Sequence, residues 1–115
     1  MDIKTSDGAL PDELTLTAIA AEVVRARTKF PSNAVLLAAL MEEVGELANA
    51  LLEHRFAVIA GKKPAELDDF RAEIQKEAIQ VAAVAVRILE DGDSSFPYMG
   101  AREKLGRASP GAQHG

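Results

Sequence analysis

Residues 36–52 read LLAALMEEVGELANALL, and this stretch decides the fold because its apolar side chains recur at helical spacing. In an α-helix each residue is rotated about 100° from the one before it. One face of this helix therefore carries Leu36, Leu40, Glu43, Leu47 and Ala50. Glu46 lies toward the edge of the same face. An unpaired buried carboxylate is costly, so this face predicts a positively charged partner for the two acids.

The helix that contains this stretch is expected over residues 34–60. Ser32 or Asn33 is a suitable N-cap, and Gly61 fits the position just after the helix end. Gly45 is unusual inside a helix, where glycine costs about 1 kcal/mol relative to alanine. We expect it to mark close approach of another backbone.

A first helix precedes this one. Pro11 and the acids Asp12 and Glu13 give a helix-start signal. Amphipathic spacing continues to about Lys29, and Pro31 ends the helix because the residue before a proline disfavours the α conformation.

The third helix is expected over residues 64–91, with Pro64 in its first turn and Gly92 after its end. Glu77 lies near the centre of its apolar stripe, with Glu73 and Gln80 on neighbouring turns of the same face. Long helices joined by short turns pack as antiparallel pairs. The two acidic faces are therefore expected to meet.

The expected architecture is a single all-α domain over residues 11–105, between a flexible arm (1–10) and a flexible tail (106–115). Its three main helices form an antiparallel bundle, with a short fourth helix over residues 98–105. Three helices give a thin core in a chain of 115 residues. Either the C-terminal segment completes a four-helix bundle, or two chains do so by association, and we expect oligomerisation.

Composition narrows the function. The formal charge of −5 and an aromatic content of 4% argue against a nucleic-acid polymer as partner, because that binding needs basic faces and stacking platforms. Cysteine is absent, which excludes thiolate chemistry and cysteine-based zinc sites. No apolar run is long enough to span a membrane, and no signal peptide is evident, so a cytoplasmic protein is expected.

The acidic faces predict a metal site. Carboxylates and an amide oxygen without thiols suit hard cations, so Mg²⁺ is expected, with Mn²⁺ as a substitute. A di-iron bundle needs Glu-x-x-His pairs, and neither His54 nor His114 lies three residues after a glutamate. Mg²⁺ in proteins commonly shares its coordination with substrate phosphates.

Glu42-Glu43-x-x-Glu46 on one helix and Glu77-x-x-Gln80 on the next resemble the MazG-like all-α nucleoside triphosphate pyrophosphohydrolases. The words LLAALMEEVGELANAL and EAIQVAAVAVRILEDGD extend the resemblance, which is strongest to the short, phage-type members. The family pattern is EExxE followed by ExxD. Gln80 departs from it, because it stands where the family usually has aspartate.

The resemblance implies Mg²⁺-dependent cleavage of a (d)NTP to the monophosphate and pyrophosphate. The catalytic residues by position are Glu42, Glu43, Glu46 and Glu77. The metal ligands it implies are Glu43, Glu46, Glu77 and Gln80, with Glu42 and Glu73 as further candidates. Family members form dimers or tetramers, so a homodimer or homotetramer is expected.

Substrate contacts follow from charge and position. Candidate phosphate partners are Lys62, Lys63, Arg71, Lys76 and Arg87, and candidates for a base pocket are Phe30, Asn33 and Asn49. Two alternatives stay open: a non-catalytic protein that binds nucleotide and metal, and a purely structural helical oligomer whose acids pair with a partner chain.

Overall fold

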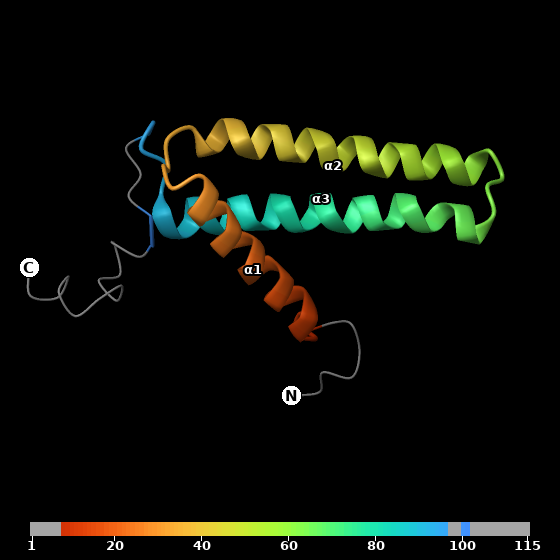
Figure 1. The fold of residues 1–115 in the computed structure, drawn as a ribbon, viewed down its shortest axis with the longest axis horizontal. Helices are drawn as coiled ribbons and strands as arrows, with labels where there is room; N and C mark the ends of the chain where they lie inside the picture. Colours follow the sequence, from red (N-terminus) through yellow and green to blue (C-terminus); the bar gives the residue numbers. More distant parts are fainter. Residues whose placement is uncertain (1–7, 97–99, 102–115) are drawn as a thin grey trace, which may run out of the picture.

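The computed structural model describes residues 8–96, 100 and 101, which contain three helices and no β-sheet (Figure 1). The helices are α1 (Glu13–Lys29), α2 (Leu36–Ile59) and α3 (Pro64–Asp91). The predicted all-α class is confirmed for these residues. No helix in this part of the chain combines the length and apolar character needed to cross a membrane.

A tight turn joins α2 to α3 and makes the two helices antiparallel neighbours (Figure 1). Gly61, with φ of 81°, follows the end of α2. Its N–H donates to Val58 O at 3.0 Å, and Lys62 N–H donates to Ala57 O at 3.1 Å. This pair of bonds is a Schellman motif, for which glycine is favoured because positive φ costs it little. The predicted position of Gly61 is confirmed.

The start and end of α3 also agree with the sequence. Pro64 is its first residue, and the Glu66 carboxylate accepts a hydrogen bond of 2.8 Å from the backbone N–H of Lys63. Gly92 follows the last turn with φ of 73°. These local signals fix the length of α3, and therefore the height at which Glu77 faces α2.

Helix α3 is central, because both α1 and α2 pack on it, α1 at an oblique angle (Figure 1). The buried apolar residues in the described part of the chain are few and mostly small: Val23, Leu36, Ala50, Ala57, Leu67 and Ala83. The core is as thin as the sequence predicts. Many larger apolar side chains remain exposed, eight of them on α2.

The N-terminus of α2 is capped by residues that follow α3. Neither Ser32 nor Asn33 is the N-cap, so that prediction is wrong; Val35 occupies the position with φ of 53°. The Asp93 carboxylate accepts a 2.8 Å hydrogen bond from Leu37 N–H. Burial tends to raise the pKa of Asp93, but hydrogen bonds from the backbone N–H groups of Ser95 and Leu37 outweigh burial and hold that pKa below its usual value.

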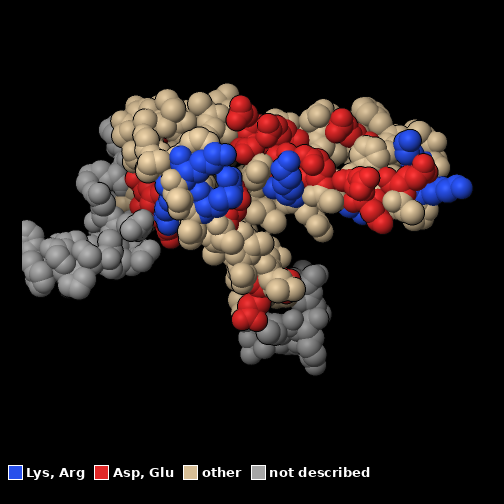
Figure 2. Space-filling view, in the orientation of Figure 1, with Lys and Arg blue, Asp and Glu red and all other residues tan. Residues whose placement is uncertain are grey.

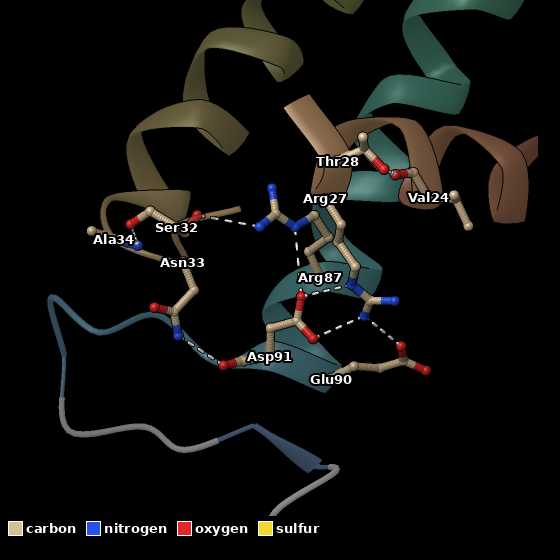
Figure 3. A network of polar contacts seen from close by, with 9 residues as sticks. All are labelled: Val24, Arg27, Thr28, Ser32, Asn33, Ala34, Arg87, Glu90 and Asp91. Carbon is tan, nitrogen blue, oxygen red and sulfur yellow. Dashed lines mark hydrogen bonds and ion pairs between the residues drawn. The ribbon is translucent and has the colours of Figure 1, made fainter. Parts of the chain in front are cut away.

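A network of ion pairs ties α1 to the end of α3 (Figure 3). The Arg27 guanidinium donates to both carboxylate oxygens of Asp91, at 2.9 and 2.8 Å, and to Glu90 at 2.8 Å. Asn33 donates to the backbone oxygen of Asp91 at 2.9 Å. These contacts hold the α1–α2 turn against α3, and thereby fix the register of α2.

The expected arm over residues 1–10 and tail over 106–115 lie largely or wholly outside the described residues. The same holds for the expected short helix over 98–105, of which only residues 100 and 101 are described. These expectations stay predictions.

Candidate metal centre

Three glutamates converge at the seam between α2 and α3. One carboxylate oxygen each from Glu43, Glu46 and Glu77 lies within 4.8 Å of the other two. Glu43 and Glu46 are one turn apart on α2, and Glu77 projects from the middle of α3. The meeting of the two acidic helix faces is therefore as the sequence predicts.

The carboxylates are set at different depths. Glu77 is only 6% exposed, Glu43 is half-buried and Glu46 is exposed. Among the described residues, the buried Oε1 atoms of Glu43 and Glu77 have no hydrogen-bond partner. Leaving a buried acceptor unpaired costs about 1–3 kcal/mol, and more for a charged group. Two such atoms in one cluster are a local cost that a bound cation would offset.

The electrostatics of the cluster point the same way. Burial, the adjacent Glu46 carboxylate and the charge of Glu77 raise the pKa of Glu43 to about 7. Burial and the nearby Glu73 carboxylate raise the pKa of Glu77, against the opposing charge of Lys76. Crowded carboxylates disfavour the ionised form until a positive charge is added.

The donor set fits a hard divalent cation. All three groups offer carboxylate oxygens, and Mg²⁺ and Mn²⁺ prefer oxygen ligands. Within the described part of the chain no ion pair forms to the three glutamates, and Lys76 pairs with Glu73 at 3.7 Å instead. The positively charged partner predicted for the acids of α2 is therefore not an ion-paired side chain of these residues.

A groove of about 400 Å³ opens beside the cluster, and we call it the carboxylate groove. Its lining residues are Glu42, Gly45, Glu46, Asn49, Ala50, Glu53, Glu73 and Glu77. Acidic side chains form a band along the α2–α3 seam in Figure 2, with a basic patch beside it where α1 crosses. The groove is therefore strongly negative unless a cation binds.

A second hollow, which we call the apolar cavity, has a volume of about 470 Å³ and lies between all three helices. Its apolar lining includes Phe30, Val35, Leu36, Ala39, Ala83 and Val84, and its polar lining includes Arg25, Ser32, Gln80 and Arg87. Glu42 borders both the cavity and the groove, and Glu43 borders the cavity. The two hollows thus meet at the carboxylates.

Four of the remaining predicted site residues divide between the two hollows. Glu73 and Asn49 line the carboxylate groove. Gln80 lines the apolar cavity rather than the groove, and Phe30 lines the same cavity with 58% of its surface exposed. Their roles as metal ligands or base contacts stay predictions.

Arg87 is 3% exposed, and its guanidinium donates to Ser32 O at 3.2 Å and lies 3.6 Å from Asp91. It supports the α1–α2 turn and also borders the apolar cavity. Asn33 belongs to the same supporting network, where it donates to Asp91, and it lines neither hollow.

The lysines and Arg71 predicted to contact phosphate line neither the groove nor the cavity. Lys76 is exposed on the side of α3 that faces α1 and lines neither hollow. Arg71 forms an exposed pair with Asp68 at 3.4 Å. Lys62 and Lys63 lie in the exposed α2–α3 turn.

The interpretation of Gly45 is wrong. A Cβ added at this position would meet no atom within 4 Å, so no backbone approaches it closely. Gly45 lines the carboxylate groove, where the missing side chain leaves open space beside Glu46.

Arg25 is a candidate functional residue that sequence reasoning missed. It lines the apolar cavity, and it pairs with Glu22, to which its Nε donates at 2.9 Å. The spacing of three residues between Arg25 and Glu22 looks like an ordinary solvated helix pair. The pKa of Arg25 is raised mainly by its hydrogen bond to Glu22, with a small further contribution from the charge of Glu43. Only the crossing of α1 over α3 brings Arg25 near Glu43.

Comparisons of the chain with protein-family profiles, curated proteins and solved structures found no match. The functional conclusion therefore rests on the carboxylate cluster and the two hollows that meet at it.

Proposed function

We propose that this chain is a cytoplasmic Mg²⁺-dependent nucleoside triphosphate pyrophosphohydrolase, which cleaves a (d)NTP to the monophosphate and pyrophosphate. The observation that carries the proposal is the convergence of Glu43, Glu46 and Glu77, with two orphaned buried oxygens, beside a cavity of nucleoside size. The resemblance of EExxE and ExxQ to the MazG-like pattern supplies the bond that is cleaved.

We assign each glutamate a role from its position in the site. Glu43, Glu46 and Glu77 would hold the metal, which when bound would supply positive charge against the phosphates and lower the pKa of a coordinated water. Glu42 is exposed at the junction of groove and cavity, where it orients the attacking water toward the α-phosphorus. The bond from that phosphorus to the bridging oxygen breaks, and pyrophosphate leaves.

The apolar cavity receives the nucleoside. Its apolar walls exclude water from the base, while Arg25 and the buried Arg87 supply positive charge at its lining. Ligand pockets of this kind combine apolar walls with a few polar groups that fix orientation. The triphosphate then extends from the cavity toward the carboxylates, which border it through Glu42 and Glu43.

A panel of (d)NTPs incubated with Mg²⁺ tests the proposal, with monophosphate and pyrophosphate measured as products. We expect Glu43→Gln and Glu77→Gln each to lower turnover at least 100-fold with helical content unchanged. Glu53→Gln is the matched control, because Glu53 lines the same groove outside the triad. Orthophosphate release would contradict the assigned bond.

Two other functions remain as alternatives, and each predicts a different result in this assay. A non-catalytic sensor, favoured by Gln80 in place of an acid, would bind nucleotide and metal without releasing product. A structural oligomer, favoured by the exposed apolar residues of α2, would bind neither. We also propose that the enzyme acts as an oligomer.

A further inference from the structure

Helix α2 carries a second apolar stripe besides the one that faces α3. The buried stripe runs through Leu36, Glu43, Ala50 and Ala57. The second, which we call the outer stripe, repeats in steps of four and three residues through Leu37, Met41, Val44, Ala48, Leu51, Arg55 and Val58. This spacing makes a continuous line along a helix and is that of a helix–helix seam.

The outer stripe is exposed to solvent along its length. Its large apolar side chains range from 43% exposed at Leu37 to 67% at Met41. It contains one charged residue, Arg55, and no acid. Isolated exposed apolar residues are normal, but a contiguous stripe of them marks an interaction surface.

The outer stripe lies away from the candidate metal centre. At about 100° per residue, Glu42, Asn49 and Glu53 fall on one side of the buried stripe and the outer stripe on the other. Helix α1 packs on α3 and leaves the outer stripe uncovered. A partner can therefore dock there without closing either the groove or the cavity.

We propose that the outer stripe is the contact for a second copy of this chain, with the two α2 helices antiparallel about a two-fold axis near Ala48. Three further exposed apolar residues of α2, Leu52, Phe56 and Ile59, flank the five large apolar residues of the outer stripe, and a standard interface of roughly 800 Å² per partner would include both groups. The two α2–α3 pairs together would form a four-helix bundle and thicken the core.

Charge selects the antiparallel orientation. A parallel two-fold pairing would set Arg55 directly against Arg55 of the second copy, and like charges that face each other across an interface repel. In the antiparallel pairing the two Arg55 residues lie 14 positions apart along the seam, about 21 Å at the helical rise. Val44 then faces Leu51, and the small Ala48 lets the helices approach closely.

The chain's own C-terminal segment is a poor occupant for the outer stripe. Residues 97–115 read PYMGAREKLGRASPGAQHG, in which the large apolar residues are only Tyr98, Met99 and Leu105. Three residues cannot match a seam that runs the length of a 24-residue helix. A second copy brings an identical stripe and satisfies it along its length.

The solution mass tests the proposal without reference to turnover, so it can fail independently of the proposed enzymatic function. We expect a mass twice the 12.2 kDa of one chain, by light scattering or sedimentation at micromolar concentration. Met41→Glu with Leu51→Glu should weaken the dimer at least 100-fold. Val24→Glu, an exposed apolar site of 63% exposure on α1, should leave it unchanged. A monomer at every concentration would overturn the proposal, whether solvent or the C-terminal segment covers the stripe.

Cysteine cross-linking tests the orientation and does not depend on the stripe variants folding. The chain has no cysteine, so Ala48→Cys introduces a single thiol, expected to form a disulfide-linked dimer upon mild oxidation. Ala38→Cys, an exposed position of α2 outside the stripe, is the matched control and should not cross-link. A dimer that cross-links through neither cysteine, or only through Ala38→Cys, would overturn the proposed axis.

Discussion

Glu43 of α2 and Glu77 of α3 meet across the helix seam, and each has a buried carboxylate oxygen without a hydrogen-bond partner. Each pKa is raised by burial and by neighbouring carboxylates. The bundle therefore tolerates a local penalty at its centre. A penalty of this kind persists where the group has a use other than stability.

Divalent metal should stabilise the protein. At a concentration of 100 times the dissociation constant, binding to the folded state alone adds about 2.7 kcal/mol. We expect millimolar Mg²⁺ or Mn²⁺ to raise the melting temperature by several degrees in thermal scans, and EDTA to reverse the change. Glu77→Gln should abolish the shift, whereas Glu53→Gln should keep it. An unchanged melting temperature in millimolar metal would remove the basis for the site.

Stability without metal should fall as the pH rises from about 5 to 8. Burial and the neighbouring carboxylates raise the pKa of Glu43 from an ordinary value of 4.5 to about 7 in the folded protein, so the folded state holds the proton more tightly in this window. Its contribution is complete below about pH 4.5 and is lost as the pH rises through about 7. Urea unfolding in EDTA should show a loss on the order of 1–3 kcal/mol. Glu43→Gln should flatten this dependence, and a wild-type stability that rises over the window would contradict the assignment.

Glu77→Leu should make the metal-free protein more stable at pH 8 and unable to respond to metal. The substitution replaces a 6% exposed carboxylate with an apolar side chain, and relieves an unpaired polar burial worth about 1–3 kcal/mol. Chemical denaturation measures the gain. Glu53→Leu, on an exposed position of α2, is the control and should change stability little. A destabilised Glu77→Leu protein would mean that the carboxylate has a partner within the bundle.

The Arg27–Asp91 pair should contribute measurably to stability. Arg27 is 31% exposed and Asp91 is 16% exposed, and two hydrogen bonds join them. Arg27→Ala should cost about 1–2 kcal/mol in urea unfolding, because charge-assisted bidentate pairs are strong. Arg71→Ala breaks an exposed single contact and should cost close to nothing. Equal losses for the two variants would show that the bidentate geometry contributes nothing extra.

Filling the apolar cavity should separate nucleoside binding from metal binding. Ala39 lines the cavity but not the carboxylate groove. We expect Ala39→Phe to raise KM for the nucleotide at least 10-fold, while the Mg²⁺-induced thermal shift stays as in the wild type. An unchanged KM would show that the nucleoside binds elsewhere.

The carboxylate cluster could be predicted because its signal is local. Glu43 and Glu77 interrupt apolar stripes at helical spacing, and a periodic pattern states directly which residues share a face. The same locality explains the success with Gly61 and Gly92, since helix-end glycines act within a few residues. Because the turn between α2 and α3 is short, the two helices pack as antiparallel neighbours, and their acidic faces meet.

Residues whose role depends on distant contacts could not be predicted. Arg25 becomes part of the apolar cavity only because α1 crosses α3 obliquely. Asp93 caps α2 from 56 positions further along the chain, so Ser32 looked like the better N-cap. The expectation of close backbone approach at Gly45 fails for a related reason. A glycine that leaves open space and a glycine that permits close packing look the same in the sequence.

The cap on α2 also sets an order of events during synthesis. Val35 holds a left-handed conformation that is strained for a β-branched residue. Two groups compensate for this strain: the Ser95 hydroxyl accepts a hydrogen bond from Val35 N–H, and the Asp93 carboxylate accepts one from Leu37 N–H. Both groups are synthesised after α3. The cap on the first turn of α2 can therefore be completed only after residues 93–95 have been synthesised, when Glu77 of α3 is already part of the chain.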